Sequence, residues 1–220
     1  MAIKILISGY ENSGKTTLIS KIEDALIINC DGKEFSIPKI HANFKEYTGF
    51  VSFSNFISDK MKAYKAKYQT FPKYLIIDTI TQLYSKMVNY NANNFNGFDI
   101  HSQNNKDTLA INDYLENIVI ANGVNVIVVA HTKIDEKTGK HIIPAQGNFK
   151  DCGSFLSICN EAFFIEKTLD DYIIHLKSRL YPARSLLDLD KESMSINEFD
   201  INEYLEKITS VKNEAEKFRL

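Results

Sequence analysis

Short apolar runs recur along the chain, separated by polar or amphipathic segments long enough to form crossover helices. The runs lie at Ala2–Ser8, Ala25–Cys30, Lys73–Asp78 and Asn125–His131. Continuous apolar strands joined by helices are typical of a parallel sheet that is buried on both faces. The pattern therefore predicts an α/β fold with a mainly parallel central sheet and helices on both faces.

The pattern changes after this region. Glu161–Lys167, Asp171–Ser178 and Arg184–Leu189 are shorter runs linked by turns, which indicates antiparallel strands added at the edge of the sheet. By contrast, residues 89–105 are rich in asparagine and show neither a strand nor a helix period. This composition predicts a mobile loop.

The last segment has a helical period. Ser195 and Glu198 fit a capping box at its start. The apolar side chains that share one helical face are Ile201, Tyr204, Leu205, Ile208, Val211, Ala215 and Phe218. We expect a core of residues 1–190 and an amphipathic helix within residues 191–220 that packs on this core. The alternative is a helix that binds a partner.

Composition narrows the class of protein. The chain has 220 residues, 44% hydrophobic and 25% charged, which is typical of one globular domain. The net charge of −2 gives no general reason to expect binding to nucleic acid or membranes, so a basic surface must be local. Cys30, Cys152 and Cys159 lack zinc-type spacing and indicate reduced thiols. With no apolar run of membrane-spanning length, we expect a cytoplasmic protein.

The first apolar run ends in a phosphate-loop motif. The pattern G-x-x-x-x-G-K-[ST] is matched by Gly9, Tyr10, Glu11, Asn12, Ser13, Gly14, Lys15 and Thr16, with Thr17 following. In such a loop the glycines let backbone N–H groups face phosphate oxygens. Lys15 then reaches the β- and γ-phosphates, and the Thr16 hydroxyl binds Mg²⁺. Residues 9–17 are therefore predicted to bind ATP with Mg²⁺.

Two further apolar strands end in polar residues suited to the same site. Asp78 closes the run Tyr74–Asp78, where a carboxylate joins the Mg²⁺ shell, although such an aspartate also serves as a helix N-cap. His131 ends the fourth run and is placed to sense the γ-phosphate. The alternative for His131 is an imidazole bonded to loop carbonyls.

A hydrolase also needs a group that orients the attacking water. Asp31 follows the second apolar run and is our candidate for the catalytic base. Glu34 and Glu11 are alternatives, and Asp31 with Gly32 is also a common turn sequence.

The phosphate loop, Asp31, Asp78, His131 and the later Lys177-Ser178-Arg179 together resemble the core of RecA-like ATPases over about residues 2–190. Within this class the chain is similar to the short phage-encoded RecA-like recombinases that assist single-strand annealing. The resemblance implies a Mg²⁺-dependent ATPase that acts on single-stranded DNA in recombination, annealing or replication. The chain departs from the family at two positions. Where this chain has Asp31 the family typically has Glu, and where it has His131 the family often has Gln.

The resemblance also implies partners. They are single-stranded DNA, further copies of the chain in a ring or filament, and a single-stranded-DNA-binding protein, with no membrane. Asn91–Lys106 matches the first DNA-facing loop and Thr132–Cys152 the second. The second loop has a local excess of basic residues: Lys133, Lys137, Lys140, His141 and Lys150, compared with the acidic Asp135, Glu136 and Asp151. Phe149 is available to stack on a base. A lid over the nucleotide is the alternative for this loop.

Lys177 and Arg179, with Arg184 nearby, match the cations that RecA-like oligomers present to the γ-phosphate of the neighbouring subunit. Exposed charges on an alternating strand are the alternative. Two other functions remain open, a small-molecule or nucleoside kinase and a nucleotide-dependent scaffold or loader. A kinase lid usually carries several arginines, whereas this chain has only Arg179, Arg184 and Arg219.

Overall fold

The computed structural model describes residues 2–35, 37–144 and 154–218. Within these residues eight strands form one sheet in the order β10-β9-β8-β1-β5-β4-β2-β3. Neighbouring strands from β8 to β3 are parallel, whereas β9 and β10 are antiparallel. The strands are β1 (Lys4–Gly9), β2 (Ala25–Asn29), β3 (His41–Asn43), β4 (Tyr74–Asp78), β5 (Asn125–His131), β8 (Glu161–Lys167), β9 (Tyr172–His175) and β10 (Ser193–Ser195). The predicted fold class is confirmed.

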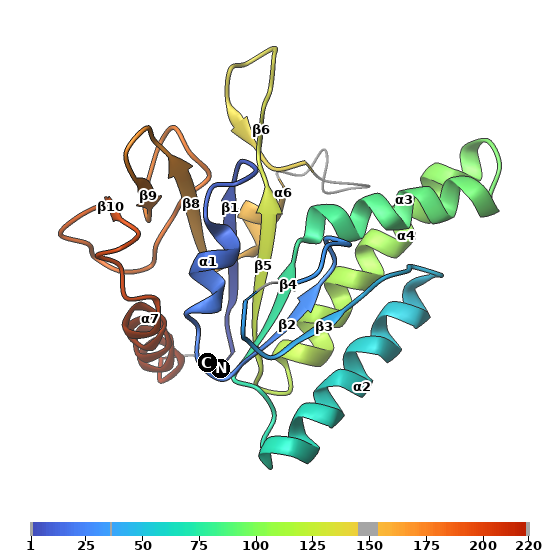
Figure 1. Ribbon diagram of the computed structural model, residues 1–220, viewed down its shortest axis with the longest axis horizontal. Helices are drawn as coiled ribbons and strands as arrows, with labels where there is room; N and C mark the ends of the chain where they lie inside the picture. The colour runs from blue at the N-terminus through green and yellow to red at the C-terminus, as the bar shows by residue number, and fades with distance from the viewer. Residues whose placement is uncertain (1, 36, 145–153, 219–220) are drawn as a thin grey trace.

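Helices cover both faces of the sheet (Figure 1). They are α1 (Lys15–Ser20), α2 (Phe50–Tyr68), α3 (Ile80–Asn94), α4 (Phe98–Tyr114) with its continuation η1 (Leu115–Ile120), α6 (Ser154–Ile158) and α7 (Ile201–Glu216). Because successive strand residues point to opposite faces, Ile5 and Ile7 pack with α1 and α7, and Leu6 packs with α2, α3 and α4. This double burial explains the continuous apolar runs in the sequence.

Strand β5 lies between β1 and β4. Its register pairs His131 with Gly9 on one side and Val129 with Asp78 on the other. The carboxyl ends of three parallel strands therefore meet at one edge of the sheet. This edge is where ligands bind in open α/β folds.

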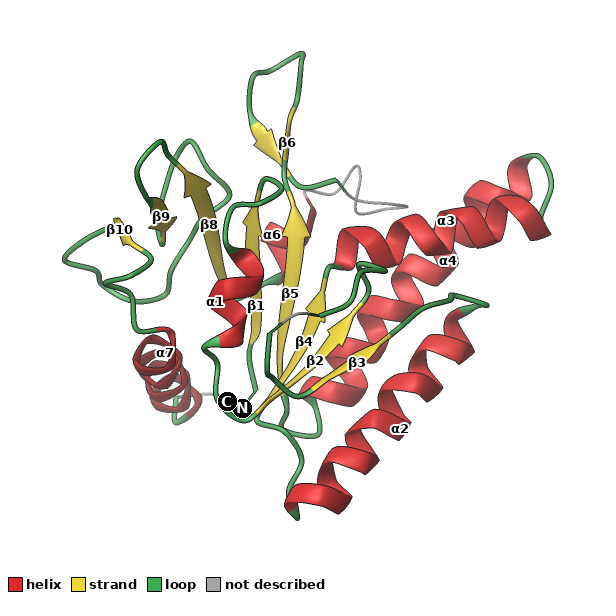
Figure 2. Cartoon of the chain, in the orientation of Figure 1, coloured by secondary structure: helices red, strands yellow, loops and turns green. Residues whose placement is uncertain are grey.

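The asparagine-rich segment is helical, so the predicted mobile loop at residues 89–105 is wrong. Helices α3 and α4 run through it and leave only a short connection at residues 95–97, as Figure 2 shows. The match of Asn91–Lys106 to a DNA-facing loop is corrected for the same reason. This part of the chain is an α-helical hairpin.

A buried polar network explains why this hairpin looked like a loop in the sequence. The Asn91 amide nitrogen donates to Asn104 Oδ1 at 2.9 Å and to Asp107 Oδ2 at 3.0 Å, and Asn91 is fully buried. Asn112 Nδ2 donates to the Tyr84 hydroxyl at 2.8 Å. These polar side chains face the interior and hydrogen-bond one another, although Asn91 Oδ1 and Asn112 Oδ1 have no partner within the described residues. The helical face therefore lacks the apolar stripe that pattern analysis detects.

The second predicted DNA-facing loop begins as a small hairpin beyond the end of β5. Strands β6 (Lys133–Ile134) and β7 (His141–Ile142) pair antiparallel, and the hairpin projects past the sheet (Figure 1). Phe149, Lys150, Asp151 and Cys152 lie outside the described residues. The structure therefore describes only the first half of the predicted loop.

Two expectations for the C-terminal part are wrong. Arg184–Leu189 does not form a strand and makes only a single β-bridge, between Arg184 and Ala162. The reason is that the Leu186 N–H donates to the Glu161 carboxylate at 2.6 Å and not to a neighbouring strand. Helix α7 is capped by Asp200, whose carboxylate accepts from two backbone N–H groups of the first turn, and not by Ser195.

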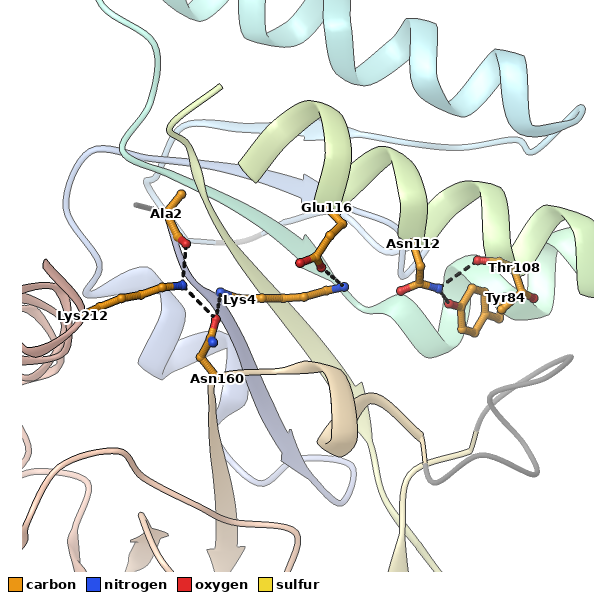
Figure 3. Close-up of polar contacts among 8 residues, drawn as sticks. All are labelled: Ala2, Lys4, Tyr84, Thr108, Asn112, Glu116, Asn160 and Lys212. Carbon is orange, nitrogen blue, oxygen red and sulfur yellow. Dashed lines mark hydrogen bonds and ion pairs between the residues drawn. The ribbon is translucent and has the colours of Figure 1, made fainter. Parts of the chain in front are cut away.

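Helix α7 packs on the sheet through the first half of its predicted apolar face. Ile201, Leu205 and Ile208 are buried, whereas Val211 is 42% and Phe218 is 85% exposed. Lys212 Nζ, further along the helix, donates to the Ala2 carbonyl at 2.8 Å (Figure 3). Figure 3 also shows Lys4, which donates from its backbone to Asn160 and from its ammonium to Glu116 on η1 at 3.3 Å. These contacts anchor β1 at the end opposite the phosphate loop.

None of the helices in the described part of the chain combines the length and apolarity that crossing a bilayer requires. Cys30 and Cys159 are buried free thiols, and burial raises the pKa of each to about 12. Both thiols are therefore protonated core residues at neutral pH.

Candidate nucleotide-binding site

The phosphate loop connects β1 to α1, and its two motif glycines are required by close contacts. A Cβ atom on Gly9 would lie 2.6 Å from the Ile165 carbonyl oxygen. Gly14 has a left-handed backbone with φ of 86° and forms the N-cap of α1. A side chain at Gly9 would clash with the backbone of β8, and one at Gly14 would be strained in its left-handed conformation.

The ammonium of Lys15 lies inside this loop. Its Nζ donates to the Gly9 carbonyl at 3.0 Å, to Ser13 Oγ at 3.3 Å and to the Tyr10 carbonyl. Burial lowers the pKa of Lys15 to about 8, although the nearby Asp78 carboxylate opposes this shift. Phosphate oxygens are stronger acceptors for an ammonium than carbonyls, so this lysine is placed to bind a polyanion that enters the loop.

Thr16 and Asp78 form a pair of oxygen donors beside Lys15. The Thr16 hydroxyl donates to Asp78 Oδ2 at 3.3 Å, and the Asp78 side chain is 4% exposed. Burial raises the pKa of Asp78 to about 6, while the hydrogen bond from Thr16 and the charge of Lys15 lower it. A buried carboxylate with so little compensation favours a bound cation.

The donor set fits Mg²⁺. Across the described residues, no group of three or more His, Cys, Asp or Glu side chains could hold a metal by itself. One hydroxyl and one carboxylate are what Mg²⁺ uses when phosphate oxygens and water complete its octahedron. Thr16 and Asp78 are thus the residues that could hold the metal, together with a bound phosphate.

These groups open into a cavity of about 740 Å³ at the carboxyl ends of the strands. The volume suits a nucleotide-sized ligand. The predicted site residues that line it are Glu11, Asn12, Ser13, Gly14, Lys15, Thr16, Thr17, Asp31, Asp78 and His131. The structure therefore brings together residues from four separate segments of the sequence.

The three candidates for a catalytic base are placed differently. Asp31 lies just after β2 and lines the cavity, and its charge acts on Lys15 and Asp78. Glu11 also lines the cavity, from within the phosphate loop. Glu34 lines a separate depression beside Asn43 and Lys45. The geometry favours Asp31 or Glu11 over Glu34.

His131 faces the cavity from the end of β5. Its backbone N–H donates to Thr81 Oγ1 at 3.3 Å, and within the described residues its buried ring atom Nδ1 has no hydrogen-bond partner. Burial, with the Lys15 charge adding to it, lowers the pKa of His131, so the imidazole is neutral at physiological pH. The neutral ring lines the cavity, and an imidazole in this state can donate one hydrogen bond to a ligand oxygen.

Tyr10 occupies the phosphate loop, but its side chain points out of the cavity. The phenol oxygen lies 2.7 Å from His141 Nδ1 on β7. The Tyr10 ring also packs edge-on against Phe164, at 6.1 Å between centroids. Only the backbone of Tyr10 faces the site, where its carbonyl binds Lys15.

Lys177 and Arg179 do not line the cavity of their own chain. Both side chains are exposed and lie in the segment after β9. Arg184, further along the chain, is also exposed and does not line the cavity. A single chain does not bring them to the phosphate loop. A role at the site of a neighbouring subunit stays a prediction.

Several cavity residues were missed by the sequence interpretation. Lys33, Thr79 and Gln82 follow Asp31 and Asp78 closely, so their proximity in sequence to those acids was an available signal. A second wall, which lies beside Gly14, had no such signal because Tyr172, Ile196 and Asn197 come from distant segments. Lys21, at the C-terminal end of α1, also lines the cavity.

The parallel sheet, the phosphate loop and the Thr16–Asp78 pair define a P-loop NTPase-like protein. A family model described as an AAA domain matches residues 1–195, and the chain belongs to that family. An AAA domain indicates nucleotide binding and hydrolysis. None of the curated proteins compared with the chain matches it.

Proposed function

We propose that this protein is a RecA-like, Mg²⁺-dependent ATPase that acts on single-stranded DNA in phage-type recombination, annealing or replication. The observation that carries the proposal is a direct connection between the nucleotide loop and the projecting hairpin. Tyr10 of the phosphate loop contacts His141 of the hairpin, and Thr132 at the hairpin's base donates its backbone N–H to the Gly9 carbonyl at 3.1 Å.

The hydrolytic part follows from the groups around the cavity. Lys15 binds the β- and γ-phosphates, and Thr16 and Asp78 would hold Mg²⁺, which would neutralise charge on the phosphates. Asp31 accepts a proton from the water that attacks the γ-phosphorus, and His131 donates a hydrogen bond to a γ-phosphate oxygen. Each of these side chains lines the same cavity.

The hairpin supports the DNA part of the proposal. Asp135 accepts from the Thr138 hydroxyl at 2.6 Å and from the Lys137 N–H at 3.1 Å, which fixes the turn and occupies this carboxylate. Lys137 and Lys140 stay exposed beside Ile134, which is 52% exposed. Exposed cations next to an apolar surface fit the backbone and bases of a single strand.

Assembly would complete the site. We propose that Lys177 and Arg179 neutralise the transition-state charge on the γ-phosphate of a neighbouring copy. Their exposure and their distance from their own cavity support this role. A single-stranded-DNA-binding protein is proposed as a further partner on the basis of the same resemblance.

The DNA part is tested by equilibrium binding of a fluorescent oligothymidylate to the full chain, with Mg²⁺ and a non-hydrolysable ATP analogue, over a range of salt concentrations. A Lys137→Ala/Lys140→Ala variant should bind more weakly, and its salt slope should fall by about 1.4, since each phosphate contact contributes about 0.7. The matched control is Lys62→Ala/Lys65→Ala, which removes two exposed lysines from α2. Its slope should equal that of the wild type.

Other outcomes identify the alternatives. ATP turnover with no detectable DNA binding at low salt would favour a small-molecule or nucleoside kinase. Nucleotide and DNA binding without turnover would favour a scaffold or loader. If the hairpin and α2 variants lost DNA affinity equally, the DNA-binding surface would not be centred on the hairpin.

A further inference from the structure

One wall of the nucleotide cavity has no part in the phosphate chemistry described above. It is built by Tyr172 at the start of β9 and by Ile196 and Asn197 just after β10. These strands are the antiparallel additions at the sheet edge. The edge therefore contributes a surface to the cavity as well as extending the sheet.

Tyr172 stands directly beside the phosphate loop. A Cβ atom on Gly14 would lie 3.3 Å from Tyr172 Cδ1, so the ring touches the backbone that precedes Lys15. The tyrosine is fixed at its backbone, since its N–H donates to Asp171 Oδ1 at 2.7 Å and its carbonyl accepts from Ile196 at 2.8 Å. The Lys167 ammonium lies over the ring at 5.8 Å from its centroid, and the residue stays partly exposed where it lines the cavity.

Asn197, which follows Ile196 in the chain, adds a polar group to the same wall of the cavity. Its backbone N–H is bonded to Ser195 Oγ at 3.2 Å, but its side-chain amide makes no hydrogen bond within the described residues. The residue is exposed, whereas Ile196 beside it is buried at 5%. The amide can therefore donate to and accept from a ligand.

A fixed aromatic ring, an aliphatic side chain and a free amide form a surface suited to a flat heterocycle with polar edges. In the sheet order β9 and β10 lie on the other side of β1 from β4, so this surface is on the side of the phosphate loop away from Asp78 and leaves room there for the rest of a nucleotide. We infer that Tyr172, Ile196 and Asn197 form the base subsite, in which a purine stacks on Tyr172 and its edge bonds Asn197. This inference rests on the proposed nucleotide-binding function.

The test compares equilibrium binding of ATP and of inorganic tripolyphosphate, each with Mg²⁺, to the full chain. Tripolyphosphate carries the phosphate contacts without a base. Tyr172→Leu keeps an apolar side chain beside Gly14 but removes the ring, and should weaken ATP binding about tenfold while leaving tripolyphosphate binding within about twofold. Tyr172→Phe should retain wild-type affinity for both ligands.

Asn197→Ala provides a second variant, at an exposed position where folding is not at risk. It should weaken ATP binding about fivefold, as expected for one lost hydrogen bond, and leave tripolyphosphate unaffected. CTP and UTP should bind wild-type protein more weakly than ATP and GTP, because a pyrimidine has a smaller stacking surface.

The base subsite is overturned if Tyr172→Leu weakens both ligands equally, since Tyr172 would then only support the phosphate loop. It is also overturned if neither variant changes ATP binding, or if wild-type protein binds tripolyphosphate as tightly as ATP. These results would leave the phosphate site intact. Wild-type protein that binds neither ligand would overturn the proposed function as well.

Discussion

The hydroxyl of Thr16 and the carboxylate of Asp78 lie 3.3 Å apart, although 62 positions separate them in the sequence. The contact joins the phosphate loop to the end of β4 and places two Mg²⁺-type donors beside the Lys15 ammonium. It also buries a carboxylate that has few other partners. Stability and metal binding are therefore linked at this pair.

Asp78→Asn should stabilise the protein at neutral pH when no nucleotide is bound. Burial raises the pKa of Asp78 from 3.8 to about 6, so the folded state resists ionisation and loses stability as pH rises between these values. Removing the charge should increase the free energy of unfolding by about 3 kcal/mol at pH 7.5. At pH 4.5 this increase should be smaller by about 2 kcal/mol.

Denaturant unfolding at the two pH values measures this difference, under nucleotide-free conditions. Asp188→Asn, at an exposed position, is the control and should change stability by less than about 0.5 kcal/mol at both. A destabilised Asp78→Asn protein at pH 7.5 would show that the carboxylate is well compensated in the folded state.

Binding of Mg²⁺-ATP should weaken as pH falls through about 6. Below this value Asp78 takes up a proton in the free protein, and metal binding must then displace it. Titration calorimetry between pH 5 and pH 8 should show proton release on binding near pH 6 in the wild type. The Asp78→Asn variant should lack that release, and an identical release in both proteins would assign it to another group.

Asp31→Asn should retain nucleotide affinity and lose ATP turnover by about a hundredfold or more, as expected when a general base is removed. The structure supplies two comparisons. Glu34→Gln, outside the cavity, should turn over ATP normally. Normal turnover by Asp31→Asn together with an inactive Glu11→Gln would assign the base to the phosphate loop itself.

The proposed contribution across subunits is tested by mixing two inactive proteins. A Lys177→Ala/Arg179→Ala variant should bind nucleotide and turn over poorly, while Lys15→Ala keeps both cations and loses its own site. Their mixture should recover a fraction of wild-type activity at mixed interfaces. Energy transfer between labelled subunits verifies exchange, and an inactive mixture despite exchange would exclude action in trans.

The sequence was sufficient for the parts of the site that follow strands directly. Lys15, Asp78 and His131 each lie at or just after a continuous apolar run, so strand order and motif spacing located them. The α3–α4 hairpin was missed because Asn91, Asn104 and Asp107 are buried and hydrogen-bond one another in its interior, and pattern analysis treats such residues as exposed.

The cavity wall formed by Tyr172, Ile196 and Asn197 was missed for a different reason. Tyr172 and Asn197 approach the phosphate loop only because β9 and β10 fold back against the sheet edge. Neither residue belongs to a local motif, and their place in the cavity wall depends on pairing between distant segments. Composition and spacing hold no information about that pairing.

The most direct test of the central claim is steady-state ATP hydrolysis by the purified chain with Mg²⁺, with and without single-stranded DNA. We expect measurable turnover that rises when DNA is added. Lys15→Ala should reduce turnover by at least about a hundredfold under both conditions, because the variant lacks the charge that stabilises the transferred phosphate. Turnover that persists unchanged in folded Lys15→Ala would contradict the assignment of this cavity as the site of ATP hydrolysis.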